Sequence, residues 1–103
     1  MSLFQNQPPV YSSTATITQV AQSAVSGTIL AANAVRLSFT IENAGSLPLD
    51  IREAAGPATA INRTIRIPPG ASFTDDQYTG IVTGLWTGAG AGNDQANVTE
   101  RIP

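Results

Sequence analysis

The stretch RLSFTIEN at residues 36–43 alternates polar and apolar side chains without interruption. Successive side chains of an extended chain point to opposite faces, so Leu37, Phe39 and Ile41 share one face of a predicted strand. The polar residues, Arg36 among them, share the opposite, exposed face. This pattern is typical of an antiparallel sheet that packs on a core with one side only.

The residues after this stretch predict its hairpin partner. The turn-forming sequence NAGS occupies residues 43–46, and alternating apolar side chains return over residues 47–53. We therefore predict a hairpin through residues 36–53. Because proline cannot donate a ladder hydrogen bond, Pro48 either moves the second strand of this hairpin towards a sheet edge or occupies a position where no ladder donor is needed.

Further stretches with strand character are separated by turn signals. They are residues 12–18, 25–30, 61–67, 72–74, 80–86 and 96–102, and the strongest turn signal is Pro68-Pro69-Gly70. Short strands at intervals of about 8–12 residues are typical of a β-sandwich. We predict an all-β fold, a β-sandwich or jelly-roll-like domain of seven or eight short antiparallel strands.

The first third of the chain differs from the rest in charge. The five arginines and seven acids, twelve charges in all, lie at or after Arg36, so residues 1–35 carry none. Two consecutive prolines near the start oppose both helix and ladder pairing. They predict an extended N-terminal arm over residues 1–11 that could reach residue 20. The sandwich domain is predicted to occupy residues 12–103.

Residues 12–35 admit two interpretations. They combine β-branched residues with small polar ones, whereas a solvated disordered tail normally carries charge and few β-branched residues. One interpretation is a set of ordinary edge strands of the domain. The other is a surface that lies against a second protein, where the backbone could pair without desolvating ions.

The composition excludes several kinds of chemistry. The chain has no cysteine, no histidine and no lysine. It therefore lacks the parts of a Ser-His-Asp or Cys-His nucleophile pair, of a Schiff base, of a disulfide and of the usual zinc site. Its net charge of −2 and five arginines also oppose binding to nucleic acid or an anionic membrane. We expect no enzyme, and no catalytic, cofactor-binding or metal-binding residues.

Two patterns resemble binding motifs, but each lacks a required part. The glycine-rich residues 88–92 have neither the third glycine nor the lysine of a phosphate-binding loop, and we predict a flexible loop there. Asp75, Asp76 and Asp94 lack the spacing of a calcium loop, and we predict that the first two end a strand. Neither pattern predicts a site.

The few aromatic residues have two possible roles. Trp86, Tyr78 and Tyr11 could stack on sugars or bases, but aromatic residues are only 6% of the chain. Core filling or an oligomer contact is the favoured interpretation.

No membrane or export segment is expected. The first ten residues lack the basic start and continuous apolar core of a signal peptide. Residues 17–32 are the most apolar stretch, yet glutamines and serines interrupt it, and it is too short for a membrane helix.

Several blocks of the sequence occur in a recognisable order. They are LAANAVRLSFTIEN at residues 30–43, GSLPLDI at 45–51, IPPGASF at 67–73, YTG at 78–80 and NVTE at 97–100. This order resembles that of small virion proteins encoded by tailed bacteriophages. The resemblance covers roughly residues 30–100, and residues 1–29 have no counterpart in it.

The resemblance implies a location and partners. Its members are β-sandwich or jelly-roll proteins on the outside of the capsid, as decoration (cement) proteins or as the base of a head fibre. For this chain it implies a structural protein made in the bacterial host cytoplasm that binds the major capsid protein. We expect self-association, as a trimer or, failing that, a pentamer, with no nucleic-acid and no membrane partner.

The apolar residues of the uncharged segment, together with one tryptophan, are the candidate assembly contacts. They are Phe4, Val10, Tyr11, Ile17, Val20 and Trp86. Two alternatives remain at this point. One is a head-fibre base or host-glycan-binding module, for which Trp86 and Tyr78 are the plausible stacking pair. The other is a connector or tail-completion protein.

Overall fold

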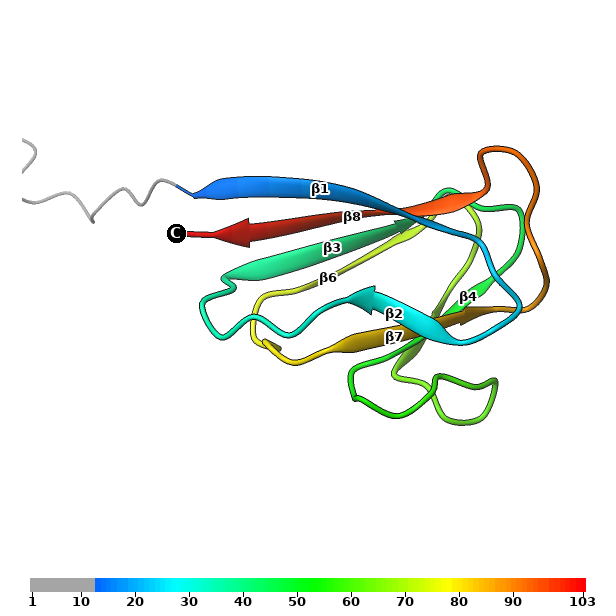
Figure 1. The fold of residues 1–103 in the computed structure, drawn as a ribbon, viewed down its shortest axis with the longest axis horizontal. Helices are drawn as coiled ribbons and strands as arrows, with labels where there is room; N and C mark the ends of the chain where they lie inside the picture. The colour runs from blue at the N-terminus through cyan, green and yellow to red at the C-terminus, as the bar shows by residue number, and fades with distance from the viewer. Residues whose placement is uncertain (1–12) are drawn as a thin grey trace, which may run out of the picture.

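The computed structural model describes residues 13–103 and contains eight strands and no helix in that part of the chain (Figure 1). The strands are β1 Thr14–Ala21, β2 Gly27–Leu30, β3 Ser38–Asn43, β4 Leu49–Arg52, β5 Ile65–Ile67, β6 Ser72–Asp75, β7 Val82–Trp86 and β8 Gln95–Ile102. The predicted all-β fold and number of strands are confirmed. Within residues 13–103 there is no helix of the length and hydropathy needed to span a bilayer.

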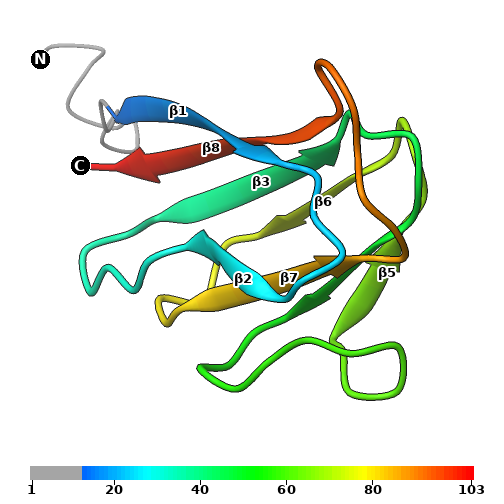
Figure 2. The same cartoon turned by 45° about the vertical axis from the view of Figure 1, so that its right-hand side comes forward.

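The strands form two antiparallel sheets, with the orders β1-β8-β3-β6 and β2-β7-β4-β5 (Figure 2). Each strand pairs with its counterpart from the other end of the chain: β1 with β8, β2 with β7, β3 with β6 and β4 with β5. The chain is thus folded in half at the loop after β4. Two further pairings, β3 with β8 and β4 with β7, join these pairs into sheets. This is the order of a jelly roll, as predicted.

The hairpin predicted through residues 36–53 is wrong. β3 and β4 lie in different sheets, so residues 44–48 cross between the two layers. Alternating apolar residues bury one face equally well in a hairpin and in an arch between facing sheets, so the pattern could not separate the two. Of the two positions predicted for Pro48, the structure shows the second: Pro48 precedes β4, where no ladder donor is needed. β4 itself is not an edge strand, because it lies between β7 and β5.

The turn predicted at Pro68-Pro69-Gly70 is confirmed. The Ala71 N–H donates to the Pro68 carbonyl at 3.0 Å, and Gly70 has a φ of 83°. Proline followed by a residue of positive φ is the type II turn, in which glycine is favoured because it has no Cβ. The turn carries the chain from β5 in one sheet to β6 in the other.

The core lies between the sheets. Its buried apolar side chains are Ile29, Phe39, Ile41, Leu49, Ile51, Ile67, Val82, Trp86, Ala96 and Val98. Fully burying one of the larger ones contributes roughly 1.5–3 kcal/mol. The strand RLSFTIEN supplies Phe39 and Ile41 to this core, as its alternation predicted. Leu37, predicted on the same face, precedes β3 and is 45% exposed.

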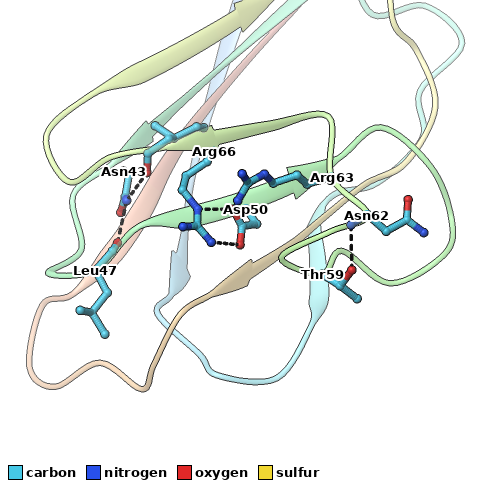
Figure 3. Close-up of polar contacts among 8 residues, drawn as sticks. Asn43, Leu47, Asp50, Thr59, Asn62, Arg63 and Arg66 are labelled. Atoms are coloured by element: carbon cyan, nitrogen blue, oxygen red, sulfur yellow. Dashed lines mark hydrogen bonds and ion pairs between the residues drawn. The ribbon is translucent and has the colours of Figure 1, made fainter.

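A buried asparagine joins the sheets at one end of the core (Figure 3). Asn43, the last residue of β3, donates from Nδ2 to the carbonyl oxygens of Leu47 at 2.9 Å and Ile67 at 2.8 Å. Its Oδ1 accepts hydrogen bonds from Trp86 Nε1 at 3.1 Å and the Gly45 N–H at 3.0 Å. All four side-chain bonding positions are therefore used. One partner lies on β5, one on β7 and two on the arch.

A buried arginine closes the opposite end. The Arg36 side chain has no exposed surface, so its predicted exposed position is wrong. Its Nε donates to Glu100 Oε2 at 2.7 Å, and Nη1 donates to the carbonyl oxygens of Tyr78 and Gly80 at 3.2 and 3.1 Å. Nη2 donates to the Ala31 carbonyl. Because Arg36 precedes β3, its side chain does not follow the alternation of the strand. It points inward and donates hydrogen bonds to carbonyl oxygens of two loops.

A substitution at Asn43 tests whether its side-chain hydrogen bonds hold the two sheets together. Asn43→Ala leaves the indole N–H of Trp86 and two buried carbonyl oxygens without partners, so we expect the free energy of unfolding to fall by about 2–4 kcal/mol. Urea denaturation followed by tryptophan fluorescence measures this. The matched control is Asn62→Ala, at an exposed loop position, which should change stability by less than about 0.5 kcal/mol. Equal urea midpoints for the two variants would show that Asn43 does not hold the sheets together.

Candidate functional site

The most accessible regular element is β1. Its ladder with β8 runs without a break through eight pairs, from Thr14–Ile102 to Ala21–Gln95. Seven of its eight residues are exposed and Val20 is half-buried, because the second sheet does not extend over it. Figure 1 places β1, in blue, at the outer edge of its sheet, with β8 as its only neighbouring strand among the described residues. β1 is therefore open on both faces and along one edge.

The register identifies the backbone groups that point away from β8. The Gln22 N–H donates to the Asp94 carbonyl at 3.0 Å, which continues the β1–β8 pairing by one position. In an antiparallel ladder, residues alternate between pairs that exchange hydrogen bonds and pairs that do not. The even-numbered residues of β1 therefore bond to β8. Ala15, Ile17, Gln19 and Ala21 direct their N–H and C=O groups towards the open edge.

The three other sheet edges are protected in ways that β1 is not. β2 has four residues and a register shift between Thr28 and Leu30. β5 has three residues, carries Arg66 and is followed by Pro68. β6 has four residues and ends in an acidic pair. Short length, irregularity, charge and proline are the usual protections against edge-to-edge pairing. β1 is long, regular, uncharged and free of proline.

Ile17 is the apolar residue on the outer face of this edge. The register places it in a row with Thr99, Thr40 and Thr74 across the sheet. Thr40 and Thr74 are joined through their hydroxyls at 2.8 Å. The side chain of Ile17 is 63% exposed at the end of this polar row. It is therefore an apolar contact that the isolated chain leaves open to water.

The predicted assembly contacts have different outcomes. Phe4, Val10 and Tyr11 lie outside the described residues. Ile17 and Val20 lie on opposite faces of β1, with Ile17 exposed and Val20 packed against the core. The prediction for Trp86 is wrong, because its side chain is only 2% exposed and donates to Asn43 inside the core.

The structure also shows which of the first 35 residues belong to strands of the domain. Residues 14–30 form the edge strands β1 and β2, which agrees with the first of the two interpretations of the uncharged segment. The suggested extension of the arm to residue 20 is wrong, because those positions belong to β1. The arm predicted over residues 1–11 lies outside the described residues. Sequence reasoning missed the open N–H and C=O groups of Ala15, Gln19 and Ala21, since backbone direction depends on the register with β8.

The aromatic pair proposed for glycan stacking does not form a platform. Trp86 is buried at the Asn43 end of the core, whereas Tyr78 lies at the Arg36 end. The Tyr78 hydroxyl donates to the Ile81 carbonyl at 2.8 Å, and the ring packs partly against the core. Separated in this way, the two rings cannot stack on one sugar.

The glycine-rich loop is tied to the body of the protein, in contrast to the flexible loop predicted from its composition. Nε2 of the buried Gln22 donates to the carbonyls of Gly88 at 3.3 Å and Ala89 at 3.2 Å. Its Oε1 accepts the Ser46 N–H at 2.9 Å. Gln22 thereby connects the end of β1 to two loops. Over residues 13–103 there is no pocket, and no three metal-ligating side chains come together.

An ion cluster covers the outer face of the second sheet (Figure 3). The buried carboxylate of Asp50 accepts hydrogen bonds from Arg66 at 2.7 and 2.9 Å and from Arg63 at 2.8 Å. The hydrogen bonds from Arg66 lower the pKa of Asp50, more than burial raises it, and Arg63 adds to the lowering. Both arginines are thus used within the fold.

Two carboxyl groups, one at the end of a strand in each sheet, form a pair. Glu53 follows β4 and Asp75 ends β6, and burial together with a hydrogen bond to Asp75 raises the pKa of Glu53 to about 7. The hydrogen bond to Glu53 and the backbone N–H groups of Gln77 and Tyr78 lower the pKa of Asp75. Glu53 Oε2 is buried and has no hydrogen-bond partner among residues 13–103. Protonation of Glu53 would place a proton between the two carboxyl groups and give this oxygen a partner.

Comparison of the chain with protein-family models, curated proteins and solved structures finds no match in any of the three.

The Asp50 cluster makes a prediction for acid stability. Asp50→Asn should lower the free energy of unfolding at pH 7 by about 1–3 kcal/mol, the discounted cost of breaking a pair whose arginines are partly exposed. Because folding lowers this pKa, the stabilisation is present above the unfolded value of about 3.9 and is lost as pH falls through the folded value. Urea denaturation between pH 7 and 2 measures the difference, with exposed Asp76→Asn as the control. A difference that persists unchanged at pH 2 would contradict an ionic origin.

The Glu53–Asp75 pair makes the opposite prediction. Folding raises the Glu53 pKa to about 7, so its stabilisation is full below the unfolded value and is lost as pH rises through about 7. Glu53→Gln keeps a hydrogen-bond donor and cannot ionise. Its Tm relative to the native chain should therefore rise between pH 5 and 8.5 and then level off. Exposed Glu42→Gln is the matched control and should give a flat difference. A flat difference for Glu53→Gln as well would refute the shared proton.

Proposed function

We propose that this chain is a non-enzymatic assembly protein of a tailed-bacteriophage particle, which binds the outside of the capsid as a decoration protein. The observation that carries the proposal is β1, a regular eight-residue edge strand that is uncharged and exposed on both faces. An edge of this kind is a template for pairing with another chain. Its natural use is the recognition of proteins through backbone hydrogen bonds.

The fold and the sequence resemblance support the virion setting. The strand order β1-β8-β3-β6 and β2-β7-β4-β5 is the jelly roll used by viral capsid and lectin domains among others. Fold by itself assigns no function. The block order over residues 30–100 is the second support, because it resembles that of small phage virion proteins. Together they favour a capsid setting for an assembly surface of this type.

The proposed mechanism is assembly through weak contacts that repeat. The uncharged N-terminal arm and the open edge of β1 lie against the major capsid protein or a neighbouring subunit, where backbone groups pair and small apolar side chains are buried without desolvating ions. One such contact is modest. Its repetition around a symmetric shell raises the overall affinity by avidity.

A connector or tail-completion protein is the second candidate, since the same edge could close a ring at one position of the particle. The base of a head fibre is a third. The glycan-binding alternative is weakened, because Trp86 is buried and does not meet Tyr78. Copy number separates the three remaining structural roles.

An electron-microscopy map of intact particles that carry this chain tests the proposal. Closed symmetry fixes subunit number, so we expect hundreds of copies on the outer shell for a decoration protein, against roughly tens for vertex fibres and about a dozen for a connector. Absence of the chain from the shell, or its presence only at one vertex, would overturn the decoration role.

A truncated chain tests whether the N-terminal segment contributes to docking on the shell. Removing residues 1–12 leaves β1 intact, and we expect at least a tenfold loss of binding to purified shells in a sedimentation assay. The urea midpoint of the truncated chain, measured alongside, should equal that of the full chain. Full shell occupancy by the truncated chain would show that residues 1–12 do not contribute to docking.

A further inference from the structure

We propose that two copies of this chain form a two-fold symmetric dimer in which their β1 strands pair antiparallel, with Ile17 opposite Ile17 of the second copy. The inference rests on the proposed assembly function and names the surface used. The result is one continuous sheet of eight strands, in the order β6-β3-β8-β1-β1-β8-β3-β6.

Backbone geometry restricts how two such edges can meet. Two identical strands pair antiparallel around an axis normal to the sheet, so each face of one sheet continues the same face of the other. Outward-directed residues must then pair with outward-directed residues. An axis through Ile17 satisfies this requirement and pairs Ala15 with Gln19 of the second copy. The N–H and C=O groups that Ala15, Ile17 and Gln19 direct outward thereby face the C=O and N–H groups of these same residues in the second copy.

The side chains select the axis. Centring the axis on Ile17 brings the exposed isoleucine of each copy together on the outer face, and it pairs Thr16 with Thr18 on the inner face. Shifting the axis to Thr18 keeps the backbone pattern but places Ile17 opposite Gln19. Burying apolar surface against apolar surface is the more favourable arrangement. Of these two axes, only the one through Ile17 brings together the two isoleucines, each 63% exposed in the single chain.

The absence of charge on β1 favours a second copy of this chain as the partner of the open edge. Near a two-fold axis each side chain lies close to its own counterpart, so any charge there meets the same charge. None of the twelve charged residues lies on β1. The remaining edges, β2, β5 and β6, are short and are irregular or charged, so they do not fit β1 as a head-to-tail partner. Cyclic trimers and pentamers cannot pair identical antiparallel edges, so this contact predicts a dimer in place of the trimer or pentamer expected from sequence.

The first experiment measures the mass of the full chain in solution. We expect sedimentation equilibrium to give a dimer and Ile17→Lys to weaken it at least tenfold, because two ammonium groups then meet at the axis. Ile61→Lys is the matched control, since Ile61 is 97% exposed on the loop after β4 and should leave the dimer unchanged. A monomer, a trimer or a pentamer for the native chain would overturn the proposal, as would a dimer that Ile17→Lys does not affect.

The second experiment tests the register, and it uses the absence of cysteine from the chain. Under oxidation, Ile17→Cys should crosslink with itself, and an equal mixture of Ala15→Cys and Gln19→Cys should crosslink better than either variant alone. Preferential crosslinking of Thr18→Cys with itself would overturn the axis through Ile17. Binding of Ile17→Lys to shells distinguishes the two proposals, because a monomeric variant that still decorates shells refutes only the role of the dimer in docking.

Discussion

The packing of the two sheets depends on one buried side chain of the first sheet that forms hydrogen bonds with the second. Asn43 ends β3, and its amide bonds reach β5, β7 and the arch that follows it. Its backbone adds two more, donating to the Ala71 carbonyl at 2.9 Å and accepting the Gly70 N–H at 2.7 Å. A buried amide is costly unless all of its groups are paired. Asn43 therefore sets where the arch leaves one sheet, where the turn before β6 enters it and how Trp86 lies in the core.

Arg36 performs the corresponding task at the other end of β3. The two polar ties are separated by the length of that strand, and the apolar core lies between them. Both ends of the core are thus closed by the hydrogen bonds of a buried polar side chain. The arginines at positions 63 and 66 are likewise used within the fold, against Asp50. Most of the charge of this small protein thus holds its own loops and sheets, which leaves the long edge of β1 uncharged.

The open edge follows from the topology. Folding the chain in half pairs β1 with β8, and because β8 also pairs with β3, the first strand becomes the end of its sheet. The second sheet does not reach β1, so its residues remain exposed on both faces. Stability of the domain does not require this strand to be uncharged. An association in which backbone groups meet backbone groups does require it, because ions would have to lose water there.

The all-β class, the approximate positions of the eight strands and the charge gap over residues 1–35 could be predicted from the sequence, because these depend on local alternation, turn residues and composition. The sequence did not determine that β3 and β4 lie in different sheets, since a hairpin and an arch bury the same alternating face. It also placed Arg36 outside and Trp86 at a contact, although both are buried. Those positions depend on partners far along the chain, Glu100 and Asn43 respectively. The identity of the strand at the open edge follows only from the complete fold, because an edge is defined by how all the other strands pair.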